Sequence, residues 1–374
     1  MRTIAAVALV WVGSAPATHA EAERTSDVAP AVEPVDLGRY APLIPRNLLG
    51  LVHAPEVHEE LGLNAEQVSG LEALFAAEVD GEWLRARNFN VEKQAPIYDR
   101  LEARVWAWFD EQANPQQSRR LRQLEYLSQG GRVLLRDDLA ATLGVTDADR
   151  SALGELSIAT QEAQVKLGRT TFGDPDIPRL REEQKKAADA ERAKLTAIIE
   201  TVPHSKVARE MGDPFDTKKL ARIYPMAPEI VPVDDWINSP PLTMAELRGK
   251  VVVVHFYAYQ CGNCHANFDV YQRWHDKLRD QGVVVLGIQT PETRSERDPE
   301  NVRRAAAARD LDFPILVDVA SENWRAWGNT VWPCVYVVDQ DGYLRRWWQG
   351  ELRWKGATGD QIIENTVNDL LQGG

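Results

Sequence analysis

The sequence predicts a chain of two parts, an all-α region followed by an α/β domain. From about residue 46 to 225, leucines and other apolar residues recur at spacings of three and four, the period of an amphipathic helix. Beyond residue 226, short β-branched and aromatic runs alternate with helical segments, which is typical of a sheet covered by helices on both faces. The length of 374 residues is enough for two domains of ordinary size.

Charge and cysteine content narrow the possible functions. The formal net charge is −13, whereas nucleic-acid phosphates and anionic membrane surfaces attract basic proteins. We therefore expect no nucleic-acid partner and interpret the acidic surface as one that keeps the protein soluble. The cysteines, Cys261, Cys264 and Cys334, are too few and too close together for a scaffold of structural disulfides.

Residues 1–20 have the composition of an export signal. A basic residue precedes an apolar run from Ile4 to Val12, which is too short to span a bilayer, and small residues follow. We expect cleavage after Ala20, with Ala17 as the second choice; an uncleaved N-terminal anchor is the alternative. Residues 21–45, rich in Pro, Ala and acidic side chains, read as a flexible linker. The mature protein is thus expected in the periplasm or otherwise outside the cytoplasm.

The predicted helical domain, residues 46–225, contains an internal repeat. The stretch LGLNAEQ at 61–67 is echoed by LGVTDAD at 143–149. In each copy a helix ends at a glycine-containing turn. Asn64 or Thr146 can then cap the next helix, because its side-chain oxygen accepts hydrogen bonds from free backbone N–H groups. The simplest interpretation is two helical hairpins that pack into a bundle.

The first copy of the repeat also resembles a motif of helical periplasmic proteins. Leu63 and Gln67 have the spacing of the LTxxQ motif of Spy-like proteins, while the second copy has Val145 and Asp149 at these places. The resemblance is confined to short stretches. It implies a helical, chaperone-like binding module.

The C-terminal domain is predicted to begin near Met226 and to run to residue 374. The β-branched and aromatic run that starts at Val251 is typical of a central parallel strand buried on both faces. A hairpin turn is expected at residues 339–342. We expect strands at Val251–Tyr259, Val283–Gln289, Ile315–Val317, Cys334–Val338 and Tyr343–Trp348, and helices at Asn263–Gln281, Glu300–Arg309 and Asp360–Leu371.

The stretch Cys261-Gly262-Asn263-Cys264-His265 fits two patterns. As Cys-x-x-Cys it has the spacing of a redox-active dithiol, and as Cys-x-x-Cys-His it is also the attachment string of a c-type haem. Its position at the start of a helix, just after a buried strand, favours the dithiol. The filled core expected around it leaves little room for a haem pocket, so haem remains a minor alternative.

Several further motifs, which follow one another along the chain, strengthen the dithiol interpretation. Residues 247–251 followed by His255-Phe256-Tyr257 resemble the entry to the first core strand of TlpA-like thioredoxins. Residues 290–292 and 298–303 resemble the DipZ-like branch, and Trp332-Pro333 lies where that family has its cis-proline. The resemblance covers about 226–374. It implies a thioredoxin-like fold and the activity of a thiol–disulfide oxidoreductase that uses no cofactor.

The expected site follows from the dithiol and the resemblance. Cys261 at the helix N-terminus should be the nucleophile, because the helix dipole favours a thiolate there, and Cys264 one turn later should resolve the mixed disulfide. The resemblance implies a proton-relay role for His255; a hydrogen-bonded core histidine is the equal alternative. It also implies that Trp332 and Pro333 bind substrate, Pro333 in the cis form.

Other residues near the dithiol are candidate modulators. His265 could favour the Cys261 thiolate, or simply face solvent. Cys334 could be a third redox thiol, or a soft-metal ligand together with the dithiol and His265, although a buried inert thiol is the favoured interpretation. Glu292 and Glu351 are expected in loops around the site, with surface carboxylates as the alternative.

The leading hypothesis is an exported thiol–disulfide oxidoreductase that exchanges disulfides with protein partners. The resemblance implies a membrane electron-transfer partner that supplies reductant. The alternative is a chaperone-like protein whose helical domain holds clients. A peroxidase is disfavoured, because Val254 and Ala258 stand where the Pro-x-x-x-Thr/Ser-x-x-Cys pattern of peroxiredoxins requires proline and threonine or serine. The direction of electron flow stays open.

Overall fold

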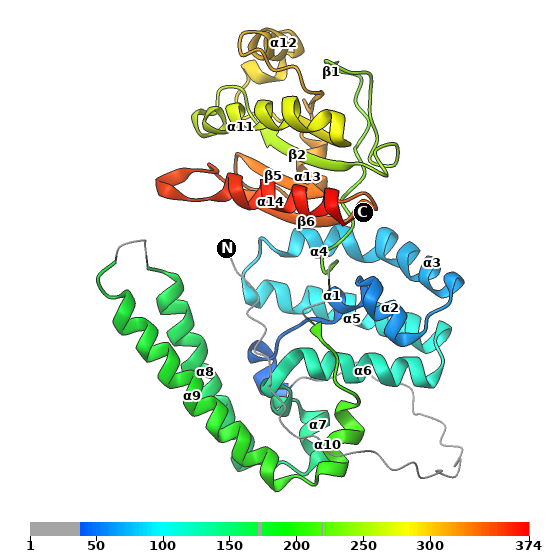
Figure 1. Ribbon diagram of the computed structural model, residues 1–374, viewed down its shortest axis with the longest axis vertical. Helices are drawn as coiled ribbons and strands as arrows, with labels where there is room; N and C mark the ends of the chain where they lie inside the picture. The colour runs from blue at the N-terminus through cyan, green and yellow to red at the C-terminus, as the bar shows by residue number, and fades with distance from the viewer. Residues whose placement is uncertain (1–37, 171–173, 218–219, 221, 374) are drawn as a thin grey trace. The chain divides into compact units, whose positions relative to one another are not determined.

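The computed structural model describes residues 38–170, 174–217, 220 and 222–373. The predicted export signal and residues 21–37 of the predicted linker lie outside the described residues. The chain forms two compact units (Figure 1). The first comprises the chain up to Val68 together with Tyr98–Ala221, and the second comprises Ser69–Ile97 together with the chain from Arg222 onward.

The first unit is built from helices, as the apolar spacing predicts. The helices α3 (Ala65–Leu74) and α5 (Val91–Gln112) belong partly to each unit. The long helices α8 (Asp147–Gly168) and α9 (Ile177–Thr201) lie side by side as a hairpin (Figure 1). The remaining elements of this unit are η1 (Gly38–Leu43), α1 (Leu48–Val52), α2 (Pro55–Leu61), α6 (Pro115–Gln129), η3 (Gly130–Leu135), α7 (Asp137–Leu143) and α10 (His204–Met211).

The end of the predicted linker is part of the packed structure. Tyr40, Leu43 and Ile44 are buried and share a core cluster with residues of η3, α7, α8 and α9. The linker prediction over 21–45 therefore extends too far along the chain. These three apolar residues show no helical period of their own, since they lie in and just after a short 3-10 helix, and their burial depends on distant partners.

The two copies of the repeat have the same local structure. Each begins with a helix that ends at a glycine in the left-handed conformation, Gly62 with φ +62° and Gly144 with φ +78°. Asn64 Oδ1 accepts from the Gln67 N–H at 2.9 Å, and Thr146 Oγ1 accepts from the backbone N–H three residues later at 3.1 Å. Both predicted N-caps are confirmed.

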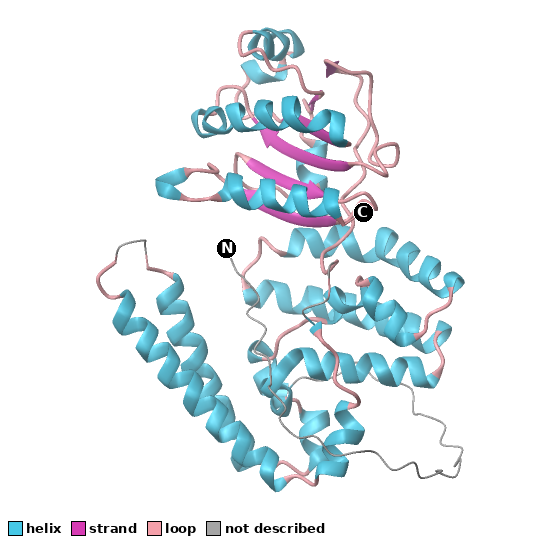
Figure 2. Ribbon diagram, viewed as in Figure 1, coloured by secondary structure: helices cyan, strands magenta, loops and turns pink. Residues whose placement is uncertain are grey.

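The second unit contains a six-stranded sheet in the order β1-β4-β3-β2-β5-β6. Figure 2 shows its strands in magenta, with helices packed beside them in cyan. The strands β2, β3 and β4 are parallel to one another, while β1, β5 and β6 pair antiparallel with their neighbours. The strands are β1 (Trp236–Ile237), β2 (Val251–Tyr257), β3 (Val283–Gln289), β4 (Ile315–Val317), β5 (Cys334–Val338) and β6 (Leu344–Gln349). The helical elements are α11 (Gly262–Leu278), η5 (Arg279–Gln281), η6 (Ser295–Arg297), α12 (Pro299–Ala307), α13 (Glu322–Ala326), η7 (Trp354–Gly356) and α14 (Gly359–Gln372).

The central strand β2 separates two apolar clusters, one on each face of the sheet. Val251, Val253 and Tyr257 belong to the cluster that contains α11 and α14, which we call the dithiol face. Val252 and Val254 belong to the other cluster, on the rear face. Successive side chains of a strand point to opposite faces, so a strand buried on both faces needs a nearly continuous apolar run, which His255 interrupts in β2. The apolar run explains why this strand could be predicted from the sequence. The strand ends at Tyr257, two residues before the predicted end at Tyr259.

The segment Ser69–Ile97 packs with the sheet, although its helical pattern placed it in the predicted domain 46–225. It includes the single-turn π-helix η2 (Phe75–Val79) and the helix α4 (Asp80–Ala86). Leu84 is buried in the rear-face cluster, and Asp80 Oδ2 accepts from the Met226 N–H at 2.9 Å. Amphipathic spacing shows that a helix has a buried face but not which partner covers it.

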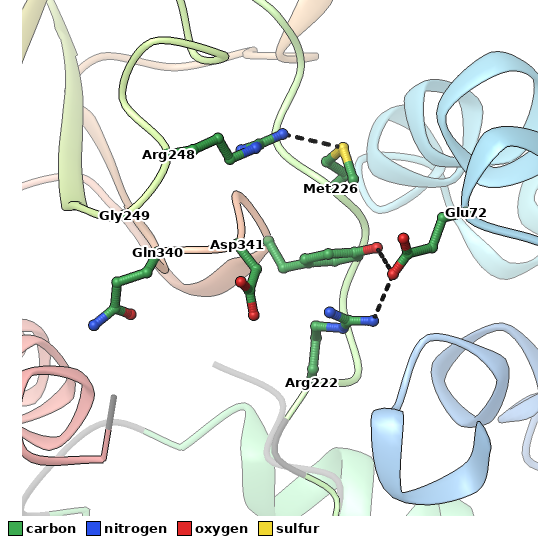
Figure 3. A pocket seen from close by; sticks show the side chains of 8 residues that line it. Glu72, Arg222, Met226, Arg248, Gly249, Gln340 and Asp341 are labelled. Carbon is green, nitrogen blue, oxygen red and sulfur yellow. Dashed lines mark hydrogen bonds and ion pairs between the residues drawn. The ribbon is translucent and has the colours of Figure 1, made fainter. Parts of the chain in front are cut away.

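The same segment reaches a surface pocket at the turn between β5 and β6 (Figure 3). There the Glu72 carboxylate accepts from Arg222 at 3.3 Å and from the Tyr343 hydroxyl at 3.4 Å. Since β5 runs antiparallel to β2, this turn lies at the edge of the sheet opposite the end of β2. The pocket is therefore remote from the dithiol. Among the described residues, no helix combines the length and apolar character that a membrane span requires.

Candidate functional site

The dithiol lies where the end of β2 leads into α11. Cys261 is the N-cap residue of α11 and is half-buried, whereas Cys264, one turn further, is completely buried on the dithiol face. Both cysteines are free thiols. Burial, together with the hydrogen bond to Cys261, raises the pKa of Cys264 far above its usual value. Cys264 therefore keeps its proton at neutral pH, and Cys261 is the cysteine that an external disulfide can reach.

His255 lies in β2 on the dithiol face, within a box of aromatic rings. Its ring stacks on Tyr271 at 4.0 Å and on Tyr257 at 5.3 Å, and the edge of Phe313 meets it at 5.0 Å. Neither ring nitrogen has a hydrogen-bond partner among the described residues. Burial lowers the pKa of His255 to about 3. The imidazole is therefore neutral at physiological pH. His255 is a core residue, but it lacks the hydrogen bonds that the alternative of a hydrogen-bonded core histidine includes.

His265 follows the dithiol on the first turn of α11. Its Nε2 lies 2.6 Å from the carbonyl oxygen of Tyr259, a distance that requires this nitrogen to donate a proton. The Arg309 guanidinium lies 3.0 Å from the same nitrogen and cannot also donate to it. The side chain thus bridges the start of α11 to the loop before Cys261, and does not simply face solvent.

The Trp332–Pro333 peptide bond is cis, as predicted. Phe256 pairs with Cys334 in the antiparallel β2–β5 register, so the start of β5 adjoins the end of β2. This places Pro333 at the sheet edge from which the dithiol loop emerges. Trp332 is half-buried against the dithiol-face cluster, and its ring stacks on Trp324 at 4.1 Å.

Cys334 is not brought together with the other two thiols. Within β5 it belongs to the rear-face cluster, whereas Cys264 belongs to the dithiol-face cluster. Its Sγ donates to the Val331 carbonyl oxygen at 3.0 Å, and burial raises its pKa to about 12. The soft-metal hypothesis required Cys334 beside the dithiol and His265, and the alternation of side chains along β5 prevents that.

A haem also fits these residues poorly, since His265 Nε2 is engaged with a backbone carbonyl and Cys264 is buried. Across the described ranges, no group of three or more His, Cys, Asp or Glu side chains is arranged to hold a metal ion.

Residues 232–347 match the AhpC/TSA family. The protein DipZ of Mycobacterium tuberculosis is 32% identical over 150 residues, which cover 39% of this chain and 21% of DipZ. The thiol-disulfide oxidoreductase YkuV of Bacillus subtilis is 29% identical over 145 residues, 38% of this chain and 93% of YkuV. A solved thioredoxin-like protein in the oxidized form is 28% identical, with a TM-score of 0.35 over 40% of this chain and 95% of its own.

The C-terminal part of this chain is a thioredoxin-fold domain of the AhpC/TSA family. The match with proteins of the DipZ type agrees with the resemblance seen in the sequence. The chain spans only about a fifth of the length of these DipZ proteins, 21%. Their likeness covers 39% of this chain, so it does not extend over the whole of both units.

A buried carboxylate of the thioredoxin-fold domain, Glu296, was missed in the sequence. It is completely buried and accepts three backbone hydrogen bonds, from Gln260 at 2.7 Å, Glu292 at 2.7 Å and Thr293 at 2.8 Å. Gln260 immediately precedes Cys261. Glu296 therefore ties the dithiol loop to the loop after β3, but nothing in the local sequence distinguishes it from an exposed glutamate.

A second buried carboxylate, Asp318, holds the start of α13, the helix that precedes the cis-proline in the chain. It accepts from the backbone N–H groups of Glu322, Asn323 and Trp324 at the start of α13, and from the Thr290 hydroxyl at 3.2 Å. Burial raises its pKa despite these hydrogen bonds. Asp318 thus connects the loop after β3 to the helix that carries Trp324.

The two candidate glutamates occupy loops near the dithiol. The Glu292 side chain is exposed, and only its backbone N–H takes part in the Glu296 network. Its negative charge acts on Cys264 and adds to the rise in that thiol's pKa. Glu351 is half-buried, and its carbonyl oxygen accepts from the Trp348 indole at 3.2 Å.

Proposed function

We propose that this protein is an exported thiol–disulfide oxidoreductase in which Cys261 attacks protein disulfides and Cys264 resolves the intermediate. The observation that carries the proposal is the contrast between the two thiols. Cys261 is accessible at the N-terminus of α11, whereas Cys264 is buried one turn away and keeps its proton. Thiolate is the attacking species in disulfide exchange, and free N–H groups at a helix start favour it.

In the reductive direction the exchange has two steps. The Cys261 thiolate attacks one sulfur of a substrate disulfide, R–S–S–R′, forms a mixed disulfide with R–S and releases R′–S⁻. Cys264 then loses its proton and attacks the Cys261 sulfur, which releases R–S⁻ and leaves the Cys261–Cys264 disulfide. Two electrons pass to the substrate, and an external dithiol must return them to the enzyme.

The proton of Cys264 needs an acceptor during the second step, and His255 is a poor one. Its pKa of about 3 lies far below the raised pKa of Cys264, so proton transfer between them is strongly uphill. The R′–S⁻ thiolate released in the first step is a stronger base. We therefore propose that the departing substrate thiolate, R′–S⁻, takes this proton and leaves as R′–SH, and that His255 serves as a neutral packing residue.

Reduction of insulin disulfides by dithiothreitol tests the proposal. Cys261→Ser should abolish catalysis, and Cys264→Ser should accumulate a mixed disulfide that non-reducing electrophoresis detects. Cys334→Ser is the matched control and should keep wild-type turnover, because Cys334 faces the rear of the sheet. Full activity of Cys261→Ser would refute the assignment.

The direction of electron flow follows from the potential of the Cys261–Cys264 pair. This potential can be measured by equilibrating the protein with glutathione redox buffers. A standard potential of about −270 mV would make the protein a reductase, and one of about −120 mV would make it an oxidase. We propose a reductase that receives electrons from a membrane partner and acts on exported proteins. Sequencing of the mature N-terminus in a secreting host tests the export: a start at residue 21 or 18 supports it.

A holdase activity of the helical unit is the second candidate. Ile158 and Val165, seven residues apart and so on one side of α8, are exposed at 45% and 38%. Exposed apolar side chains on a hairpin can hold unfolded clients. The double change Ile158→Ser and Val165→Ser should then weaken suppression of client aggregation, while Cys261→Ser should leave it intact. If the double variant suppresses aggregation like wild type, this face holds no clients.

A further inference from the structure

The segment that leads to the cis-proline, residues 327–333, forms a loop between α13 and β5; we call it the cis-proline loop. Trp327 at its start is completely buried, whereas Val331 is 44% exposed. Gly328 adopts a left-handed conformation, φ +60°, and a Cβ there would lie 2.9 Å from the Arg85 side chain. The loop thus makes a close approach to the last turn of α4.

Arg87, at the C-terminal end of α4, forms two hydrogen bonds at this loop. Its Nη2 donates to the Trp327 carbonyl oxygen at 2.9 Å and to the Tyr336 hydroxyl at 2.5 Å. The Tyr336 hydroxyl in turn donates to Asn329 Oδ1 at 2.5 Å. Each group has a consistent role, because the hydroxyl accepts one hydrogen bond and donates another. One guanidinium therefore holds the loop through both a backbone and a side-chain contact.

Other donors hold further carbonyl groups of the loop. Asn88 Nδ2 donates to the Gly328 carbonyl oxygen, and Cys334 Sγ donates to the Val331 carbonyl oxygen. A loop packed against a protein interior must pair such groups, since each unpaired buried carbonyl costs free energy. The donors Arg87 and Asn88 precede the residues whose carbonyl groups they bind, Trp327 and Gly328, by 240 residues in the sequence.

We propose that Arg87, assisted by Asn88, is a positioning residue that holds the cis-proline loop in the shape that accepts a polypeptide substrate. This inference rests on the proposed function. Arg87 does not touch the dithiol, because its partner Tyr336 belongs to the rear-face cluster while Cys264 lies on the dithiol face. Its effect should appear in the recognition of a protein disulfide and not in the intrinsic reactivity of Cys261.

The test compares a protein substrate with a small one, in the full-length chain. Arg87→Met removes every donor but keeps an unbranched side chain, and Arg87→Lys restores one donor. For Arg87→Met we expect the KM for insulin to rise about tenfold, the equivalent of about 1.4 kcal/mol, with an unchanged Cys261–Cys264 potential. Reaction with the small disulfide 5,5′-dithiobis(2-nitrobenzoate) should keep its rate, and Arg87→Lys should recover part of the lost affinity.

Arg181→Met is the matched control, since Arg181 is exposed on α9. An unchanged KM for insulin in Arg87→Met would overturn the inference, and so would equal losses with insulin and the small disulfide. If Arg87→Met does not fold, Asn88→Ala removes only the Gly328 contact, and an unchanged KM there would overturn the inference instead. Inactive wild-type protein would instead refute the proposed function.

Discussion

Acidification should destabilise the thioredoxin-fold unit through His255. This side chain is completely buried, stacks on Tyr271 at 4.0 Å and has no hydrogen-bond partner among the described residues. Burial lowers the pKa of the folded-state imidazole to about 3, from an ordinary value of 6.5. Below pH 6.5 the unfolded chain binds a proton at this position that the folded chain does not, so the equilibrium moves toward unfolding.

The magnitude follows from proton linkage. The stabilising contribution of the neutral histidine is complete above pH 6.5 and falls by about 1.4 kcal/mol for each pH unit between 6.5 and the folded-state value. Between pH 7.5 and 4.5 the unit should therefore lose about 2.7 kcal/mol on account of His255 alone. The loss is large compared with the usual effect of one side chain.

Urea unfolding at these two pH values, followed by tryptophan fluorescence, measures the effect. His255→Phe keeps an aromatic ring in the box but cannot titrate, so its free energy of unfolding should depend less on pH, by about 2.7 kcal/mol over this interval. His204→Gln, at an exposed histidine of α10, should behave like wild type. Equal losses of stability in wild type and His255→Phe between pH 7.5 and 4.5 would contradict this role of His255.

Three further substitutions test the packing around the site and in the helical unit. Glu296→Gln should cost about 2 kcal/mol, because one buried amide cannot accept the hydrogen bonds that the carboxylate accepts, and hydrogen exchange of the Gln260 amide should accelerate. Gly287→Ala should lower the free energy of unfolding by about 1–3 kcal/mol through overpacking, since a Cβ there would lie 3.1 Å from His255 Nε2. The midpoint of urea unfolding measures this loss, and an unchanged midpoint would show that neighbouring side chains can move to accommodate the methyl group. Arg136→Met should destabilise the helical unit by about 1.5–3 kcal/mol, because it removes the completely buried guanidinium that lies 3.0 Å from Glu125 and leaves that carboxylate with Arg122, at 2.6 Å, as its cationic partner; thermal unfolding by circular dichroism measures this, and a loss below about 1 kcal/mol would contradict it.

Much of the α/β domain was predictable because its signals are local. The nearly continuous apolar run of β2, the period of α11 and the dithiol between them all lie within the short segment 251–278. The strands β3, β4 and β5 have the predicted bounds. The cis peptide before Pro333 was predicted from the resemblance to thioredoxins alone, and the structure confirms it.

Features that depend on distant partners were not predictable in this way. The helical pattern of Ser69–Ile97 is like that of its neighbours, and its membership of the second unit rests on contacts with residues far along the chain. The burial of Glu296 arises where two loops converge. The side on which Cys334 lies depends on its register with β2.

The amino-acid sequence by itself determined the helical and extended segments, the capped helices of the repeat and a dithiol at the start of α11. These follow from periodicity and side-chain chemistry that act between near neighbours. Only the tertiary structure decided that Cys264 is buried while Cys261 is accessible, that Cys334 faces away from both, and that Arg87 supports the cis-proline loop. The physical reason is that burial, pKa and hydrogen-bond pairing depend on which segments meet in space, and hydrophobic packing selects those contacts across the whole chain.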